Sequence, residues 1–150
     1  ALLSSVLFTS IDSARIKTRN TQRIANANAI ATGFYVATTG TTNKFPITNV
    51  EYCLGKDPCW NESYNNSPMI DALLKTGMAG GVIPLDPFWK ANQYGDAFLY
   101  YADTALSYIQ WVMEYEPGNE NQPCGRGLAS SISANGLNDY ICELYLYSSF

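Results

Sequence analysis

Residues 1–39 read ALLSSVLFTSIDSARIKTRNTQRIANANAIATGFYVATT, a stretch that contains no proline and only one glycine, the late Gly33. Its apolar side chains recur mostly every three or four residues, which is the spacing of one face of an α-helix. The recurring positions are Leu3, Leu7, Ile11, Ala14, Ile24, Ala27, Ala31 and Phe34. The threonine-rich run around Gly40 then ends the pattern by turn chemistry. The sequence therefore predicts one long helix over residues 1–39.

This helix changes character along its length. Residues 12–39 are amphipathic, with polar side chains filling the second side, whereas residues 1–11 are apolar almost all the way round. The apolar positions of this first segment are Leu2, Leu3, Val6, Leu7, Phe8 and Ile11. A segment that is apolar on every side buries itself in lipid or against neighbouring subunits rather than on one domain face. We expect it to be the end of a longer apolar helix, since a bilayer span needs roughly 20 residues; the alternative is an ordinary buried helix end.

Residues 40–150 predict a single globular head that begins with loops and a short helix. Residues 52–68 are rich in asparagine and serine and indicate an irregular surface segment. Ser67 followed by Pro68 is a typical helix start, because serine is a favoured N-cap and proline suits the first helical turn. A short helix is expected over about 68–76.

The second part of the head predicts a small antiparallel sheet over about 97–147. Residues 97–102 and 108–115 are rich in aromatic and β-branched side chains and are separated by a connector of hairpin length. Residues 116–127 contain proline, glycine and asparagine and indicate a loop, and residues 140–147 predict the last strand. The expected fold class is α+β, a long N-terminal helical stalk packed on a small sheet.

The four cysteines, Cys53, Cys59, Cys124 and Cys142, match no zinc signature, and the chain has no histidine. We therefore expect two disulfides in an oxidising compartment and assign no metal and no cofactor. Pairing of nearest neighbours gives Cys53–Cys59 and Cys124–Cys142, although four cysteines permit three connectivities.

The composition indicates one folded, non-enzymatic domain. With 150 residues, 47% hydrophobic and 15% charged, the chain is long and apolar enough to bury a core. A catalytic site would need a base, a nucleophile or a metal, and neither a nucleophile-elbow motif nor a phosphate loop is present. Only carboxylate pairs are left as candidates, Asp86 with Asp96 or Glu114 with Glu116, and the sequence does not set their separation. We expect no catalytic residue.

The charge is uneven along the chain. Five basic residues against Asp12 give residues 1–46 a charge of +4, so the remainder carries −8 of the net −4. Stacked subunits could therefore meet through opposite charges. The basic run Arg15, Lys17, Arg19 and Arg23 is interpreted first as a solvated face or a source of salt bridges between subunits. Contact with anionic lipid headgroups and binding of DNA are the alternatives.

Two further surface features have both a structural and a functional interpretation. The aromatic cluster comprises Phe98, Tyr100, Tyr101, Tyr108, Trp111 and Tyr115. It could bind sugar or a surface, but alternation in a sheet turns about half of it inward, and we assign Phe98, Tyr100 and Trp111 to the core. Asn61 and Asn65 begin N-glycosylation sequences, a pattern that is frequent by chance in asparagine-rich loops.

Three segments together resemble one protein family. The run Ser13-Ala14-Arg15-Ile16-Lys17-Thr18-Arg19 is similar to the second half of the first helix of bacterial type IV pilins and type II secretion pseudopilins. Ahead of it, Leu3-Ser4-Ser5-Val6-Leu7 resembles the end of the hydrophobic helix of that family. Ile83-Pro84-Leu85-Asp86-Pro87-Phe88-Trp89 resembles the pseudopilin Pro-x-Asp-Pro-Trp pattern. The similarity in the order of elements runs from about Leu2 to Tyr147. The family's Gly-Phe-Thr-Leu-x-Glu processing site and its calcium loop have no clear counterpart in these residues.

The resemblance implies a structural subunit of an extracellular type IV pilus-like or pseudopilus filament. Identical copies would polymerise through the apolar residues 1–11 into a helical homo-oligomer. Before assembly the subunit would be anchored in the cytoplasmic membrane and would meet the pilus or secretion assembly machinery. The alternative is a minor tip subunit, an adhesin-like module that binds glycan, a surface or DNA through residues 117–140 or 61–67.

Overall fold

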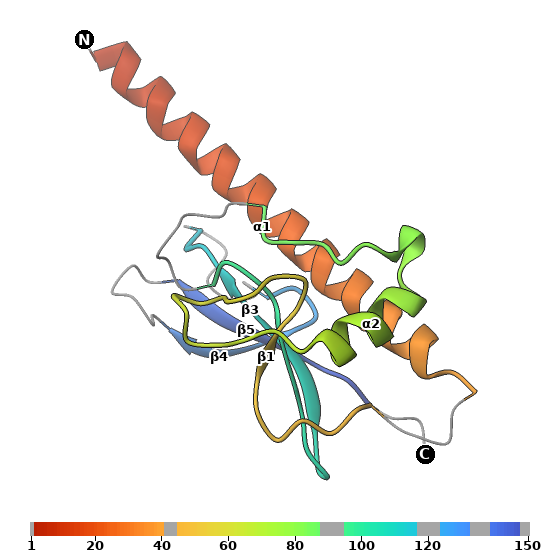
Figure 1. Ribbon diagram of the computed structural model, residues 1–150. Helices are drawn as coiled ribbons and strands as arrows, with labels where there is room; N and C mark the ends of the chain where they lie inside the picture. Colours follow the sequence, from red (N-terminus) through yellow and green to blue (C-terminus); the bar gives the residue numbers. More distant parts are fainter. Residues whose placement is uncertain (1, 41–44, 88–94, 117–123, 133–138, 148–150) are drawn as a thin grey trace.

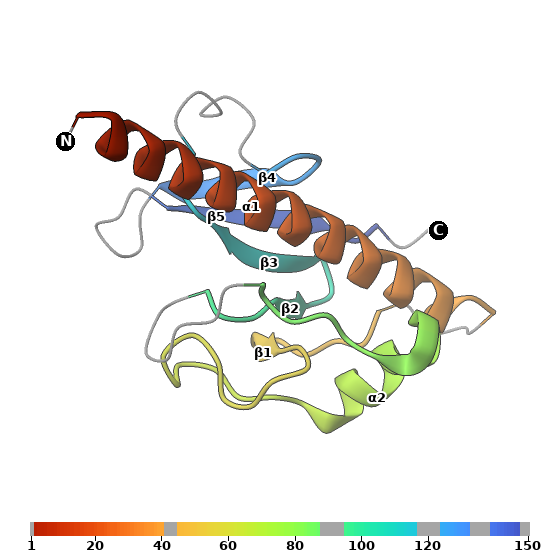
Figure 2. The ribbon, with the colours of Figure 1, turned by 90° about the horizontal axis from the view of Figure 1, so that it is seen from above.

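The computed structural model describes residues 2–40, 45–87, 95–116, 124–132 and 139–147, with the backbone alone described for 2–10 and 128–132. One long helix, α1, lies across an antiparallel sheet, and a short helix, α2, packs beside the C-terminal half of α1 (Figure 1, Figure 2). This architecture belongs to the α+β class, as the sequence predicts.

Helix α1 spans Leu2–Thr38, 37 residues, and ends where the sequence predicts. The Thr38 and Thr39 hydroxyls donate to backbone carbonyl oxygens one turn earlier, Phe34 O at 2.8 Å and Tyr35 O at 2.7 Å respectively. Gly40 then adopts φ +79°, a left-handed conformation that glycine takes without a steric penalty. The chain therefore leaves the helix at a residue suited to terminate it.

The C-terminal half of α1 carries the apolar stripe that holds it to the head. Ala27, Ala31 and Phe34 are buried as the periodicity predicts, and Ile24 is half-buried. Ile30 is buried as well, although the predicted stripe omitted it. Ring stacking adds to this contact, because Phe34 lies 4.6 Å from Tyr100 between ring centroids.

Helix α2, Pro68–Gly77, follows the prediction closely and is succeeded by a 3-10 turn, η1, at Ala79–Gly81. Its start differs in one respect from the expectation. Ser67 occupies the N-cap position, but its side chain makes no capping hydrogen bond. Its carbonyl oxygen accepts instead from the Asp71 amide at 3.0 Å. Proline at the first helical position therefore sets the helix start without a serine cap.

The sheet contains five antiparallel strands in the order β1-β2-β3-β5-β4. Their bounds are Tyr52–Cys53 for β1, Leu99–Ala102 for β2, Ser107–Met113 for β3, Leu128–Ile132 for β4 and Tyr140–Tyr145 for β5. The predicted hairpin is confirmed, with Tyr101 opposite Tyr108 and Ala102 opposite Ser107. At its turn, Asp103 Oδ1 accepts from the Ala105 and Leu106 amides at 2.7 and 2.9 Å.

Strands β1 and β4 were not expected. Strand β1 is two residues long and lies inside the segment interpreted as irregular, so it offers no alternation to recognise. Strand β4 reads LASSI, in which small residues replace the β-branched and aromatic side chains typical of strands. Both lie at the edges of the sheet and pair with one neighbour each, β2 and β5 respectively.

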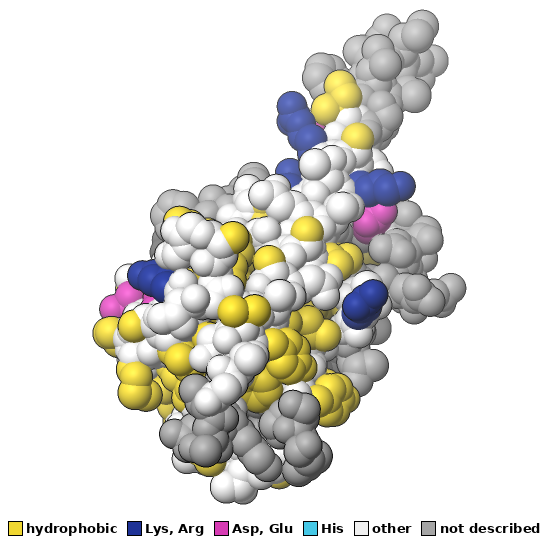
Figure 3. Space-filling model, turned by 90° about the vertical axis from the view of Figure 1, so that its right-hand side faces the viewer, with side chains coloured by type: hydrophobic (Ala, Val, Ile, Leu, Met, Phe, Trp, Pro, Cys, Tyr) yellow, Lys and Arg dark blue, Asp and Glu magenta, His cyan; other side chains and the backbone are white. Residues whose placement is uncertain are grey.

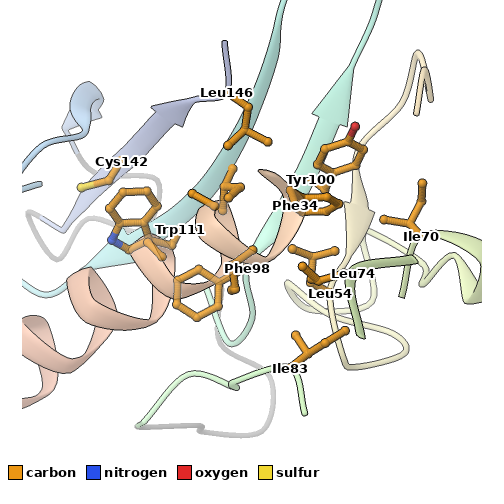
Figure 4. Close-up of a cluster of buried hydrophobic side chains, with 14 of the residues drawn as sticks. Phe34, Leu54, Ile70, Leu74, Ile83, Phe98, Tyr100, Trp111, Cys142 and Leu146 are labelled. Atoms are coloured by element: carbon orange, nitrogen blue, oxygen red, sulfur yellow. The ribbon is translucent and has the colours of Figure 1, made fainter. Parts of the chain in front are cut away.

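The main core fills the space between the sheet and the two helices (Figure 4). Phe98, Tyr100 and Trp111 are all buried in it, which confirms their assignment to the core. Cys142 of β5 lies beside Trp111, and the Cys124–Cys142 disulfide links β5 to the segment before β4.

A second, smaller cluster lies on the outer face of the sheet, the face that does not carry α1. Residues of the 53–66 loop cover Leu99 and Val112 there. The Cys53–Cys59 disulfide closes the first part of this loop, and Trp60 Nε1 donates to Ala97 O at 2.8 Å. The two disulfides thus join the cysteines in nearest-neighbour order, and no cysteine is free.

Candidate assembly site

The N-terminal half of α1 projects beyond the head, while the C-terminal half lies on the sheet (Figure 1). Between Ile11 and Thr18 every side chain is exposed except Ile16, which is half-buried. Burial on the head begins at Arg19 and Asn20. Ala14 continues the predicted stripe but is exposed, because the helix has already left the head at that point.

The residues expected to form a filament core all lie on this projecting segment. Leu2, Leu3, Val6, Leu7 and Phe8 belong to the continuous helical backbone, and their side chains lie outside the described residues. Ile11 is the member whose side chain is described, and it is 45% exposed. Figure 3 shows hydrophobic and basic side chains on the part of the helix that rises above the head.

A buried ion-pair network fastens α1 to the head where the helix begins to project. The Arg23 guanidinium donates to Asp86 through Nε at 2.6 Å and Nη2 at 2.9 Å, and through Nη1 to Glu114 Oε1 at 2.6 Å. The Arg23 and Asp86 side chains are only 5% and 2% exposed. Bidentate pairing with full burial makes this a strong and directional contact once the desolvation of both charges is offset.

Arg19 and Asn20 extend the network along the helix. Arg19 donates to both carboxylate oxygens of Glu114, at 2.7 and 2.5 Å. Asn20 donates through Nδ2 to the Glu114 carbonyl at 2.8 Å and accepts from the Glu114 amide at 3.1 Å. We call Arg19, Asn20, Arg23, Asp86 and Glu114 the helix clamp. It joins α1 to the loop after η1 and to the residue that follows β3.

The helix clamp corrects the interpretation of the basic run as a solvated face. Arg19 and Arg23 pair within the molecule, because they are four residues apart on one helix face and meet head carboxylates there. Arg15 lies one turn further out, is 69% exposed and reaches Asp12 only at 3.8 Å. Lys17 is exposed too. Only these two basic residues of the run are therefore available to another molecule.

Three of the four carboxylates considered as catalytic candidates have structural partners, and the fourth, Glu116, is half-buried. Asp86 and Glu114 belong to the helix clamp. Asp96 pairs with Lys56 and accepts from the Trp60 amide at 2.7 Å. Within the described ranges, no group of three or more ligating side chains could hold a metal ion.

The asparagine-rich loop is placed on the surface. Asn61 and Asn65 are both exposed. Trp60, Asn61 and Glu62 have φ values of 52°, 56° and 61°, a left-handed turn that asparagine tolerates better than most residues. The Asn65 carbonyl accepts from the Cys53 amide at 2.9 Å, so its backbone is anchored while its side chain is free to meet solvent. Most of the 117–140 segment, the other suggested recognition loop, lies outside the described residues.

Acid should weaken the helix clamp, and comparing the stability of the wild type with that of Glu114→Gln at several pH values tests this. Burial alone would raise the pKa of Glu114, but hydrogen bonds from Arg19 and Arg23 outweigh it and hold the pKa below its ordinary value. Such a carboxyl stabilises the fold above its unfolded pKa of about 4.3, and this contribution disappears as pH falls through the lower folded value. We expect urea unfolding to show the wild type more stable than Glu114→Gln at neutral pH, with the difference shrinking below about pH 4.

The comparison between the two proteins reports on Glu114 and, to a smaller extent, on Asp139. Burial raises the pKa of Asp139, and the charge of Glu114 adds to this increase, so Asp139 makes the fold less stable above its pKa, opposite to Glu114. Stability curves that stay parallel from neutral to acid pH would contradict the assignment.

Comparisons with known proteins leave the site to be judged on its own geometry. No family model matches the chain, and neither the curated proteins nor the solved structures contain a match. Among the helices of the described residues, none is long and apolar enough to cross a membrane.

Proposed function

We propose that the chain is a structural subunit of an extracellular type IV pilus-like or pseudopilus filament, which polymerises through the apolar N-terminal half of α1. The observation that carries this proposal is the division of one continuous helix into a clamped half and a projecting half. The helix clamp and the apolar stripe use the C-terminal half, and the exposed Ile11 lies on the other. A helix on an antiparallel sheet is also compatible with a pilin-like fold.

The proposed assembly follows from the cost of exposing apolar side chains. Burial of one leucine-sized side chain stabilises a contact by about 1.5–3 kcal/mol, so several such residues on neighbouring helices favour a bundle at the filament axis. The helix clamp would keep each head at a fixed angle to its helix, so that repeated contacts generate a regular polymer. Arg15 and Lys17, at the boundary between core and heads, would contact neighbouring subunits or solvent.

The proposed location follows from the disulfides. Two disulfides persist in oxidising surroundings, outside the cytoplasm. The subunit would stay anchored in the cytoplasmic membrane, with its head on the outer side, until the assembly machinery extracts it. We propose a structural role and no catalytic one, in keeping with the use of Asp86 and Glu114 to hold α1.

Substituting Ile11 tests the proposal against a matched control on the same helix. Ile11 and Val36 are both exposed β-branched residues of α1, at 45% and 55%, but only Ile11 lies on the projecting half. Ile11→Asp would place a charge inside the packed helices and should weaken self-association about tenfold or more, a change of about 1.4 kcal/mol. Val36→Asp should leave self-association unchanged.

The measurement is sedimentation velocity over a wide range of protein concentration, with negative-stain electron microscopy of the concentrated samples. A wild-type chain that stays monomeric throughout would contradict the proposal. So would Ile11→Asp and Val36→Asp proteins that associate equally well.

A further inference from the structure

Three tyrosines lie side by side on the outer face of the sheet. Tyr101 of β2 is directly opposite Tyr108 of β3, which is directly opposite Tyr145 of β5. The Tyr101 and Tyr108 rings stack with centroids 5.1 Å apart, and the Tyr108 and Tyr145 rings meet at 62° with centroids 6.0 Å apart. We call these three residues the tyrosine row. The 53–66 loop covers the neighbouring part of this face, over Leu99 and Val112, and the tyrosine row lies on the part beyond it.

Each hydroxyl of the tyrosine row is already used as a donor. Tyr101 donates to Asp103 Oδ2 at 2.9 Å, Tyr108 to Glu51 Oε1 at 3.0 Å, and Tyr145 to Glu143 Oε2 at 3.1 Å. The remaining hydrogen-bonding capacity of these groups is therefore to accept, because a carboxylate has no donor and each phenol has one. The face offers a partner aromatic rings and acceptor oxygens.

The three carboxylates also make this face negative. None of the ion pairs among the described side chains involves Glu51, Asp103 or Glu143. Burial, and after it the charge of Glu51, raises the pKa of Tyr108 above its ordinary value, as expected for a phenol in a negative potential. Glu143 also accepts from Gln110 Nε2 at 3.0 Å, which fixes the position of its carboxylate on the sheet.

We propose that the tyrosine row, with Glu51, Asp103 and Glu143, binds an extended segment of a partner polypeptide that carries arginine or lysine side chains. A guanidinium group has only donors, pairs with carboxylates and stacks on tyrosine rings, so it complements this face in charge and hydrogen bonding. A neutral glycan brings acceptors as well as donors, and the face has few donors to meet them. The row crosses three strands, about 10 Å at roughly 4.8 Å per strand spacing, which suits two basic side chains of an extended segment better than a single ion.

The binding face and the proposed assembly site are separate. Helix α1 packs on the inner face of the sheet, with Ile109 and Trp111, whereas the tyrosine row lies on the outer face. In a filament built on α1, the sheet would separate the tyrosine row from the core and leave it facing outward. The inference does not require polymerisation, and it can be tested at concentrations where the chain is monomeric.

The probe is a hexa-arginine peptide with blocked ends, compared with hexacitrulline, which has the same shape without charge. We expect the wild-type chain to bind hexa-arginine at least tenfold more tightly than hexacitrulline, measured by fluorescence anisotropy at low salt, with binding weakening as salt rises. The double substitution Glu51→Gln and Glu143→Gln should weaken hexa-arginine binding about tenfold, while glutamine still accepts from the tyrosine hydroxyls and keeps the fold. Tyr145→Leu should weaken it by a smaller factor, through loss of a ring.

The control removes the same charge elsewhere. Asp12→Asn with Glu62→Gln neutralises two exposed carboxylates that are not part of the tyrosine row, one on α1 and one on the 53–66 loop. This pair of substitutions should leave hexa-arginine binding within about twofold of the wild type, which measures the effect of net charge alone. Equal weakening by both double variants would reduce the effect to net charge and overturn the proposal. Equal binding of hexacitrulline, or tighter binding of neutral maltohexaose, would overturn it in favour of a sugar-binding face.

Discussion

Gly77→Ala is expected to lower the free energy of unfolding by about 2 kcal/mol or more, which is a large effect for one methyl group. A Cβ on Gly77 would lie 1.9 Å from the carbonyl oxygen of Gly33 and 2.8 Å from the backbone nitrogen of Ala37. Both atoms belong to the backbone of α1, so the clash cannot be relieved by a side-chain rotation. Helix α2 would have to move away from α1 and open the core between them.

The sign of this effect is informative because helix propensity acts in the opposite direction. Alanine stabilises a helix by about 1 kcal/mol relative to glycine. If Gly77 had no close neighbour, Gly77→Ala would therefore raise the free energy of unfolding of the protein. Urea unfolding of the variant separates the two cases. Thr76→Ala, at the exposed neighbouring position, is the control and should change stability by less than about 0.5 kcal/mol.

Gly33→Ala provides a graded comparison on the other helix. Its Cβ would first meet Met78 Sδ at 2.4 Å and Leu74 Cδ1 at 3.0 Å, which are the ends of flexible side chains. The loss of stability should therefore be smaller than for Gly77→Ala. A Gly77→Ala protein as stable as the wild type, or less affected than Gly33→Ala, would mean that the helices do not cross at these glycines.

The crossing also illustrates how far sequence reasoning reaches. The periodicity of residues 1–39, the proline at residue 68 and the alternation of residues 97–115 are local signals, and the elements they predict are present. Gly77 directly follows the helix predicted over about 68–76, and the sequence does not mark it as a contact residue. Its contact with Gly33 joins segments 44 residues apart by their numbers, and no local pattern encodes such a contact.

The same reason explains what was missed at the candidate site. A run of basic residues on a helix is usually solvated, and Arg15 and Lys17 follow that rule. Arg23 does not, because its partners Asp86 and Glu114 are 63 and 91 residues away along the chain. The Asp-Pro segment that suggested a family resemblance thus has a physical use here, since its carboxylate binds the helix. Strand β4 was missed for a different reason, its small side chains, which carry little β-propensity.

Arg23→Met should destabilise the protein by about 3–5 kcal/mol, the range expected when one partner of a buried ion pair is removed. The substitution keeps most of the volume of the side chain but removes both hydrogen bonds to Asp86 and the one to Glu114. The 2% exposed Asp86 carboxylate would then lose its principal counter-charge. Arg15→Met, which removes an equal charge from an exposed position of the same helix, should change stability by less than about 0.5 kcal/mol.

A second substitution distinguishes the buried charge from the loss of packing. Asp86→Asn added to Arg23→Met removes the carboxylate that the first change leaves behind, and should restore part of the lost stability, with a coupling of the order of 1–3 kcal/mol. Denaturant unfolding of the wild type, the two single variants and the double variant gives this coupling directly. Simple additivity would show that Arg23 stabilises the protein independently of Asp86, through its contacts with Glu114 and Asn20.

The position of Arg23 gives this cycle a consequence for assembly. Arg23 lies where α1, followed from its N-terminus, first contacts the head, and the turns before this point project from the head. Loss of the pair should therefore loosen α1 from this end, and amide hydrogen exchange should increase at residues 19–26 before it increases at Ile30 or Phe34, which the apolar core still holds. If exchange rose uniformly along α1, or not at all, the direction of the projecting helix would be determined by the apolar stripe alone, and the helix clamp would have no part in setting the angle between helix and head.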